Sequence, residues 1–475
     1  MSLALAVLLG YALLQVGLGL WMGRKVKGSD DFFVAGRRLG PGLLFSTLVA
    51  ANIGAGSTVG ATGLGFRDGL SAWWWVGSAG IGSLILAFLV GPRMRQVAAK
   101  YSLSTVGDYL ELRYSKGVRG GVVLLLWVGT LTILAGQLVA AGKILQVVTG
   151  QPAWVGCIIG GVAMTAYFTA GGLMGAVWVN ALQLVVEVGV YCFLIPAAIA
   201  SAGGWASVVA HTPTDPAYWT FWQGGGSGWK YLIMLAPAFV ISPGLLQKVY
   251  GARDDRTVRI GVGLNAVLLL AFAFVPTILG IVARALHPTL TDHELALPTL
   301  LLNDLPPVLG AFGLAAAFTT DINTADAVLF MLSTSLAQDL YKGFLNPAAS
   351  DQQVLRVARG AAMTAGALGV AFAVAAPSVI GSLSIFYTLL SVCLFVPIIA
   401  GLFFPRVETR EAVTSMAVGV TLTLLLHVST GGKGYGPITP ALLGIGAGAL
   451  TCALMTVLRP KANARPERPT SSTWR

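Results

Sequence analysis

The feature that most constrains this chain is a long succession of apolar segments, each about 20 residues in length, the length of helix that crosses the hydrocarbon core of a bilayer. Charged residues make up only 10% of the sequence, hydrophobic residues make up 56%, and the mean hydropathy is +0.78. We therefore predict an all-α, polytopic membrane protein in which a single transmembrane domain covers residues 1–458. About thirteen transmembrane helices can be placed, at 2–22, 42–66, 70–91, 118–148, 153–169, 175–201, 229–248, 257–286, 306–340, 354–376, 378–404, 411–429 and 437–458.

The basic residues test this threading, because Lys and Arg gather on the cytoplasmic side of membrane proteins. With thirteen spans in order, 25 of the 30 Lys and Arg residues fall on one side. This predicts an N-terminus outside the cell, a cytoplasmic C-terminus and a location in the cell membrane. The net charge of +11 then reflects topology, and we expect no nucleic-acid partner. The tail 459–475 is rich in Pro, Arg and Ser and is predicted to be disordered.

Two of the spans are interrupted near their middle. The second span is polar and glycine-rich around Gly54, and the seventh contains Pro237, Pro243 and Gly244, of which the two prolines lack a backbone donor. Five helices separate one interruption from the next, which indicates two five-helix inverted repeats, at 42–201 and 229–404. One extra helix at 2–22 precedes them, and two more at 411–458 follow. Broken helices of this kind offer free carbonyls and amides to a transported solute.

Several motifs, in order along nearly the whole chain, resemble the sodium:solute symporter family, which includes sodium/glucose, sodium/proline and sodium/pantothenate carriers. The resemblance implies a leucine-transporter-like fold. The motifs are the loop 31–37 (DFFVAGR), the break at 50–53 (AANI), the stretch 167–183 beginning YFTAGGL, the segment 243–248 (PGLLQK), and 323–326 (NTAD) running to 338–342 (QDLYK).

In that family a sodium ion is held by carbonyls at the first break and by side chains of the ninth span. The matching positions here are the carbonyls of Ala50 and Ile53 and the side chains of Thr320, Asn323 and Thr324, which share one helical face. Oxygen ligands suit a hard cation. Family members usually have serine at the position of Asn323, and many have an aspartate, which helps to bind a second sodium ion, at the position of Asn180. We therefore expect one ion per transport cycle.

Three carboxylates lie deep in apolar spans, where a charge is costly and needs a partner, a proton or an ion. They are Glu187, Asp321 and Asp326, our candidates for ion coupling. Asp326 matches an acidic position of the family and has a structural alternative, in which it ties helices together. Asp321 is unusual for the family and either restores negative charge near the ion site, carries a proton or is a hydrogen-bonded packing carboxyl.

The solute is expected beside the broken helices. The candidate ligands are Asn52, Gly56 and Ser57 at the first break, Ser242 at the second, and Gln137 and Tyr387 on neighbouring spans. The run Trp73-Trp74-Trp75 stands where sugar-carrying relatives have a glutamate, which disfavours a hexose. No intramembrane Lys or Arg is expected to face the pocket, so an anionic solute would depend on helix N-termini and sodium.

These observations predict sodium-coupled symport of a small polar organic solute by alternating access. The partners are then the solute, the sodium ion and membrane lipid, with no cofactor. One alternative keeps the fold and couples transport to protons, and another is a solute sensor or channel-like protein that does not pump. An enzyme is not expected, because the four histidines show no metal-binding spacing and no nucleophile motif accompanies them.

Overall fold

The computed structural model describes residues 3–23, 39–222, 228–375, 378–436 and 438–459, and in these ranges the chain is helical apart from turns, loops and two isolated β-bridges. Most side chains between residues 166 and 188 also lie outside the described part. The α-helices are α1 (Leu3–Gly23), α3 (Pro41–Asn52), α4 (Ala61–Asp68), α5 (Trp73–Ile85), α6 (Gly91–Lys100), α7 (Val106–Arg113), α8 (Lys116–Thr149), α9 (Ala153–Ser201), α10 (Trp205–His211), α11 (Gly228–Ile241), α12 (Pro243–Tyr250), α13 (Asp255–Phe272), α14 (Phe274–Leu286), α15 (Ala296–Asn303), α16 (Pro307–Thr334), α17 (Asp351–Ala375), α18 (Val379–Phe403), α19 (Thr409–Thr430) and α20 (Pro440–Leu458).

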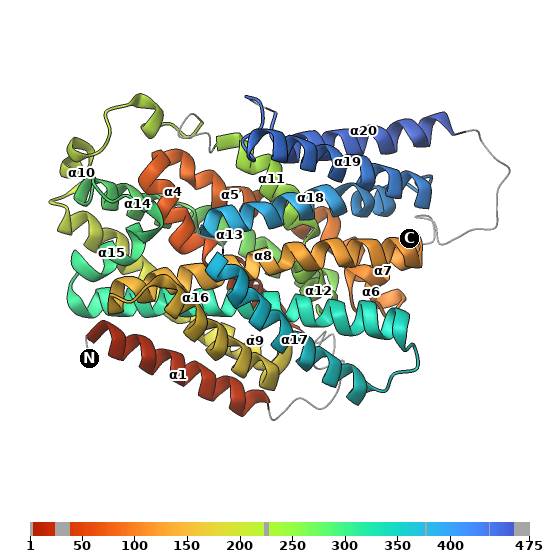
Figure 1. Ribbon diagram of the computed structural model, residues 1–475, viewed down its shortest axis with the longest axis horizontal. Helices are drawn as coiled ribbons and strands as arrows, with labels where there is room; N and C mark the ends of the chain where they lie inside the picture. Colours follow the sequence, from red (N-terminus) through yellow and green to blue (C-terminus); the bar gives the residue numbers. More distant parts are fainter. Residues whose placement is uncertain (1–2, 24–38, 223–227, 376–377, 437, 460–475) are drawn as a thin grey trace.

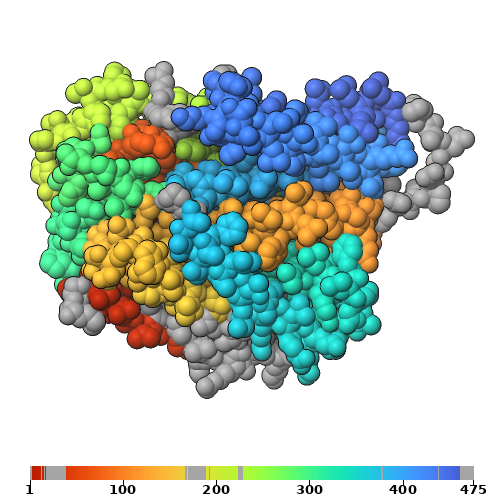
Figure 2. All heavy atoms as spheres, in the orientation of Figure 1, coloured from red at the N-terminus to blue at the C-terminus, as the bar shows by residue number. Residues whose placement is uncertain are grey.

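The helices lie roughly side by side along the long axis of the molecule (Figure 1). Helix α1 lies on one face against α9 and α16, and the α19–α20 pair lies on the opposite face against α18. The segment that carries the first break is enclosed between these layers: residues 53–66 are buried, and only a small orange-red patch of this region is visible in the space-filling view (Figure 2). The breaks therefore lie inside the helix bundle.

The contacts between helices are reciprocal. Helix α3, which opens the first predicted repeat, packs against α13 of the second, and α11, which opens the second repeat, packs against α5 of the first. In the same way α8 packs against α18, and α16 packs against α9. Two repeats with the same internal order produce this pattern of contacts when they interlock.

The spans predicted at 153–169 and 175–201 are joined in the structure. Helix α9 runs without interruption from Ala153 to Ser201, so the loop expected at 170–174 was wrong. That segment has no proline and no charge, and its glycines do not end the helix. At 49 residues, α9 is more than twice the ~20 residues that one crossing needs. Helix α9 is therefore long enough for the two predicted crossings, but the structure has no loop between them.

In the described part of the chain, eight helical runs are long and apolar enough to cross a membrane, and a bent pair formed by Gly189–Ser201 and Trp205–His211 would make a ninth. The prediction of a polytopic, all-helical membrane protein agrees with this. The count of thirteen transmembrane helices stays a prediction.

Candidate ion and solute site

The first break changes the backbone hydrogen bonds of residues 50–57. Helix α3 ends at Asn52, and the amide of Gly54, which would otherwise bond to Ala50, donates to the hydroxyl of Ser57 at 2.9 Å. The amide of Ser57 donates in turn to the carbonyl of Gly54 at 2.9 Å, and not to Ile53. The carbonyls of Ala50 and Ile53 therefore lose the donors that an unbroken helix would supply.

Both released carbonyls point to the hydroxyl of Thr324 on α16. Its Oγ1 lies 3.1 Å from the oxygen of Ala50, 2.9 Å from that of Ile53 and 3.1 Å from that of Thr320. A threonine hydroxyl has one hydrogen, so it can satisfy only one of the three carbonyls at a time. Four oxygens with a surplus of lone pairs meet at one buried point, which is the ligand type that a hard cation such as sodium requires.

The other side chains predicted for the ion differ in their geometry. The hydroxyl of Thr320 donates to the carbonyl of Ala316 at 2.7 Å, so Thr320 contributes its carbonyl to the cluster and its hydroxyl turns away. A helix threonine commonly bonds back in this way. Asn323 is buried on the same helix, at 3% exposure. Gly54 is required for the close approach, because a Cβ there would lie 2.3 Å from the Thr324 hydroxyl oxygen.

Asp321 lies one helical turn before Thr324. Its Oδ1 accepts a hydrogen bond from the hydroxyl of Thr58 at 3.1 Å, and the same hydroxyl lies 2.9 Å from the carbonyl of Gly54. One shared hydroxyl thus connects this carboxylate to the first break. Asp326, also on α16, is buried, and the side chain of Glu187 lies outside the described residues.

The second break consists of Ser242 alone, which is the only non-helical residue between α11 and α12. Pro243 occupies the first position of α12, where a missing amide costs nothing, and Gly244 follows it. Pro237 does not mark a break, contrary to our prediction, because it lies inside α11. The hydroxyl of Ser391 on α18 donates at 2.7 Å to the carbonyl of Met234, in the turn before Pro237. The carbonyl that Pro237 leaves without a helical donor is that of Ile233, so this bond lies one residue away from the one that is missing.

Two adjoining cavities lie between the breaks, and together they are lined by all six residues predicted to bind the solute. The Trp75 cavity is lined by Ala51, Asn52, Gly54, Gly56, Ser57, Trp75, Val76, Ala79, Gln137, Leu235, Phe239, Thr324, Leu383 and Tyr387. The Lys248 cavity is lined by Ala51, Asn52, Ile133, Phe239, Ser242, Gly244, Leu245, Lys248, Thr324, Ala327, Val328, Phe330, Met331, Phe386 and Tyr387. Thr324 borders both cavities, so a solute in either one lies next to the oxygen cluster.

The polar residues of the Trp75 cavity are held in place by further contacts. The side-chain oxygen of Gln137 accepts the free amide of Ala55 at 2.8 Å, and the NH2 group of that side chain is not used in this bond. Asn52 donates at 3.1 Å to Asn265 on α13, a residue that the sequence did not single out. The ring of Tyr387 lies 6.1 Å from that of Trp75, edge to face, which gives the cavity an aromatic wall.

The model of one protein family matches residues 32–419, which is most of the chain, and the family is the sodium:solute symporter family. The chain belongs to this family. It is 26% identical to the human sodium/iodide cotransporter over 94% of this chain and 72% of the relative. It is also 26% identical to the sodium/pantothenate symporter of Escherichia coli strain K12, over 92% of this chain and 93% of the relative. Like its relatives, this symporter is an integral membrane transporter and not an enzyme.

A solved structure confirms the fold of the symporter. A sodium-coupled sialic acid symporter, in a substrate-bound outward-open state, superposes with a TM-score of 0.82 at 16% identity and covers 96% of this chain and 98% of its own. The structure of Mhp1, a nucleobase-cation-symport-1 family transporter in a closed conformation, superposes with a TM-score of 0.56. The predicted leucine-transporter-like architecture is therefore confirmed, although the number of helices is not.

The symporter differs from our prediction in having a lysine at its central cavities. Lys248 is 3% exposed and lines the Lys248 cavity, and its ammonium donates to the carbonyl of Thr47 on α3 at 2.6 Å. We expected no such residue, because Lys248 ends the predicted span at 229–248, where a lysine usually extends to the membrane surface. In the structure α12 begins only at Pro243, so Lys248 lies in its second turn and is still inside the bundle.

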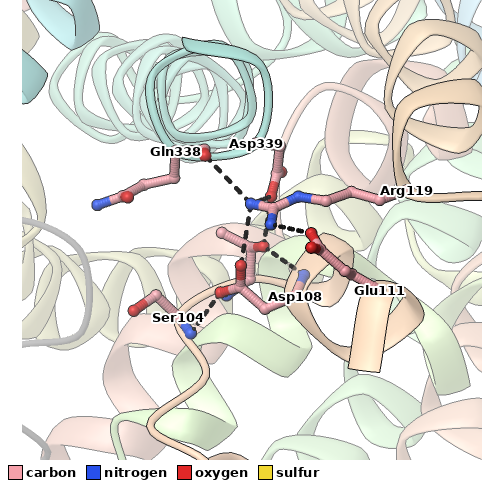
Figure 3. A network of polar contacts seen from close by, with 7 residues as sticks. Ser104, Asp108, Glu111, Arg119, Gln338 and Asp339 are labelled. Carbon is pink, nitrogen blue, oxygen red and sulfur yellow. Dashed lines mark hydrogen bonds and ion pairs between the residues drawn. The ribbon is translucent and has the colours of Figure 1, made fainter. Parts of the chain in front are cut away.

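A third cavity borders a buried charge network at the start of α8. Figure 3 shows this network. This Asp339 cavity shares Met331 and Phe386 with the Lys248 cavity, and its other lining residues are Thr105, Val106, Gly107, Leu110, Val122, Val123, Leu126, Trp127, Thr130, Pro243, Gln247, Leu332, Thr334, Ser335, Asp339 and Leu390. The guanidinium of Arg119 lies 2.7 Å from Asp339, 2.9 Å from Asp108 and 2.8 Å from Glu111. These contacts tie the segment after α16 to α7 and α8.

A second buried network lies near the other end of α8. The ammonium of Lys143 is 2.6 Å from Asp292 and 3.0 Å from Glu294, in the segment between α14 and α15. Glu294 also accepts hydrogen bonds from the hydroxyl of Ser378 and the amide of Ile380, where α18 begins. Helix α8 thus carries one buried cation near each end, and each cation contacts its own cluster of carboxylates.

Proposed function

We propose that this symporter couples the inward movement of sodium to the uptake of a small polar organic solute by alternating access. The single observation that carries the proposal is the cluster in which Thr324 meets the carbonyls of Ala50, Ile53 and Thr320. The cluster joins α3 to α16, so an ion bound there stabilises one arrangement of the broken helix relative to the rest of the bundle. In the predicted orientation the protein lies in the cell membrane with its N-terminus outside the cell. The Arg119 network is then on the cytoplasmic side.

The proposed coupling follows from the shared wall. The ion touches Thr324, and the solute touches residues of the same two cavities, including Asn52 and Tyr387. Two ligands raise each other's affinity when both favour the same conformation, and the effect is necessarily reciprocal. Sodium is therefore expected to increase solute affinity, and the solute to increase sodium affinity by the same factor.

Proton coupling on the same fold is a second candidate, favoured by the position of Asp321. Its hydrogen bond with Thr58 connects a buried carboxylate to the broken helix, so a proton bound there could replace the ion in ordering the break. Asp326 and Glu187 remain further candidates for this role. Solute uptake that persists without sodium and follows an imposed pH gradient would favour this mechanism.

A pair of variants tests the sodium site. Thr324→Val keeps the shape of the side chain and removes the hydroxyl, whereas Thr324→Ser keeps the hydroxyl. We expect Thr324→Val to raise, at least about tenfold, the sodium concentration that gives half-maximal solute uptake in proteoliposomes or half-maximal thermal stabilisation of the purified protein. Thr324→Ser should retain the sodium dependence of the wild type. Accumulation of solute above its external concentration distinguishes a pump from a sensor or channel. Equal sodium dependence in both variants would contradict the proposed site.

A further inference from the structure

We infer that the transported solute is a small organic monoanion, a carboxylate with an apolar body, whose charge is bound by Lys248. This inference rests on the proposed function and names the substrate class of the same cavities. It starts from a buried cation that borders the solute cavity and has no carboxylate as its partner in the described part of the chain.

Lys248 differs in this respect from the other buried basic residues described above. Arg119 is surrounded by three carboxylates and Lys143 by two, whereas in the described part of the chain the ammonium of Lys248 has one hydrogen-bond partner, the neutral carbonyl of Thr47. None of the ion pairs in the described part of the chain involves Lys248. An ammonium has three hydrogens to donate, and a buried cation without an anion is unfavourable. A solute that brings its own negative charge supplies the missing partner.

The charged residues of the cavity walls also favour a negatively charged solute. Among the described residues that line the Trp75 and Lys248 cavities there is no Asp or Glu, and Lys248 is the only basic one. A cationic solute would therefore find no counter-charge there and would meet the ammonium instead. A sodium ion at Thr324 adds a second positive charge beside the same cavities, so it attracts an anion and repels a cation.

The remaining wall of the Lys248 cavity indicates what the rest of the solute is like. Most of it is formed by aromatic and aliphatic side chains, among them Phe239, Phe386, Leu245 and Ile133. The polar side chains of this wall are those of Asn52, Ser242, Thr324 and Tyr387. An apolar surface of this kind binds an apolar body and leaves few donors for a polyhydroxylated one. One ammonium matches one carboxylate, and a second anionic group would be buried without a partner.

The experiment compares carboxylates with their neutral amides on the purified full-length symporter. The probes are phenylacetate with phenylacetamide and propionate with propionamide, and binding is measured as ligand-dependent thermal stabilisation in sodium and in choline buffers. We test the wild type, Lys248→Met, Lys248→Arg and the control Lys433→Met, which removes an exposed lysine. We expect a carboxylate to bind the wild type at least about tenfold more tightly than its amide, and this preference to disappear in Lys248→Met. It should persist in Lys248→Arg and in the control.

The sodium titration separates this inference from the proposed function. Stabilisation by sodium alone, in the wild type and in Lys248→Met, shows that the variant is folded and that the ion site is intact. Carboxylates that bind no better than amides, or a preference that survives in Lys248→Met, would overturn the anion assignment and leave sodium symport in place. If the thermal stabilisation measured in sodium buffer were the same as that in choline buffer, the proposed ion coupling would be overturned instead.

Discussion

Gly54 occupies a position where any side chain would enter the ion site. A Cβ there would lie 2.3 Å from the hydroxyl oxygen of Thr324 and 2.9 Å from the side-chain oxygen of Gln137. We expect Gly54→Ala to push both groups away and to raise the sodium concentration for half-maximal stabilisation at least about tenfold. Gly121→Ala is the matched control, because nothing lies within 4 Å of a Cβ at that position on α8. A sodium titration of thermal stability compares the two, and equal midpoints would contradict the geometry proposed for the site.

Asp321 provides a test of charge at the same site. If its carboxylate restores the negative charge near the ion, Asp321→Asn keeps the shape and the contact with Thr58 but weakens cation binding. We expect the apparent sodium affinity to fall about threefold to tenfold, which is the effect of one charge in a partly screened environment. Asp351→Asn, at an exposed position where α17 begins, is the control. Unchanged sodium and pH dependence of uptake in Asp321→Asn would remove the coupling role.

At this scale the sequence predicts positions better than it predicts orientations. The family motif placed Ala50, Ile53 and Thr324 in one cluster, and the structure brings them together. It did not show that Thr320 uses its carbonyl, because whether a helix hydroxyl bonds back to its own turn depends on the neighbouring helices. Nor did it show the inward position of Lys248, which depends on where α12 begins.

Between elements, the short segment from α14 to α15 packs over α4. A Cβ at Gly63 would lie 2.9 Å from the carbonyl of His293, so this segment and the second half of the broken helix are in close contact. Partial burial and the nearby charge of Arg67 lower the pKa of His293. The imidazole of His293 is therefore neutral in the folded protein at neutral pH, because its surroundings disfavour the protonated form.

This pKa shift predicts acid sensitivity. Because the folded state lowers the pKa, the unfolded chain binds more protons as the pH falls below about 6.5, the ordinary value for histidine, and folding stability decreases. We expect His293→Gln to reduce the loss of thermal stability between about pH 6.5 and pH 5, relative to the wild type. His427→Gln, on α19, is the control. An identical acid-side decline in both variants would show that His293 does not titrate as its surroundings indicate.

The same elements show what a pattern of residues can and cannot predict. Glycine, asparagine and proline in apolar spans located both breaks, because each residue weakens or prevents a helical hydrogen bond. The prediction was wrong at Pro237, which lies inside α11 without ending it, and at 170–174, where two glycines were not enough to end α9. Neither one proline nor a pair of glycines is by itself enough to end a membrane helix.

Across the whole molecule, α8 connects two buried charge networks that lie on opposite sides of the central cavities. Arg119, at its start, binds the segment after α16, and Lys143, near its end, binds the segment before α15 and the start of α18. Alternating access requires that one side open while the other closes. Each network holds one side together, so we propose that their relative strengths set which side is open at rest.

Weakening one network at a time tests this proposal. Arg119→Met leaves Asp339 buried without its cation, and Lys143→Met does the same to Glu294, at a cost of about 3 kcal/mol for each buried partner. In a background without the native cysteines, reporter thiols are Ser335→Cys in the Asp339 cavity and Ala79→Cys in the Trp75 cavity. We expect Arg119→Met to speed labelling at 335 and slow it at 79, and Lys143→Met to do the reverse, because both draw on one conformational equilibrium. Arg459→Met, which breaks a more exposed ion pair with Glu408, should change neither rate. If both variants instead speed labelling at both positions, the networks only stabilise packing and do not set the direction in which the symporter opens.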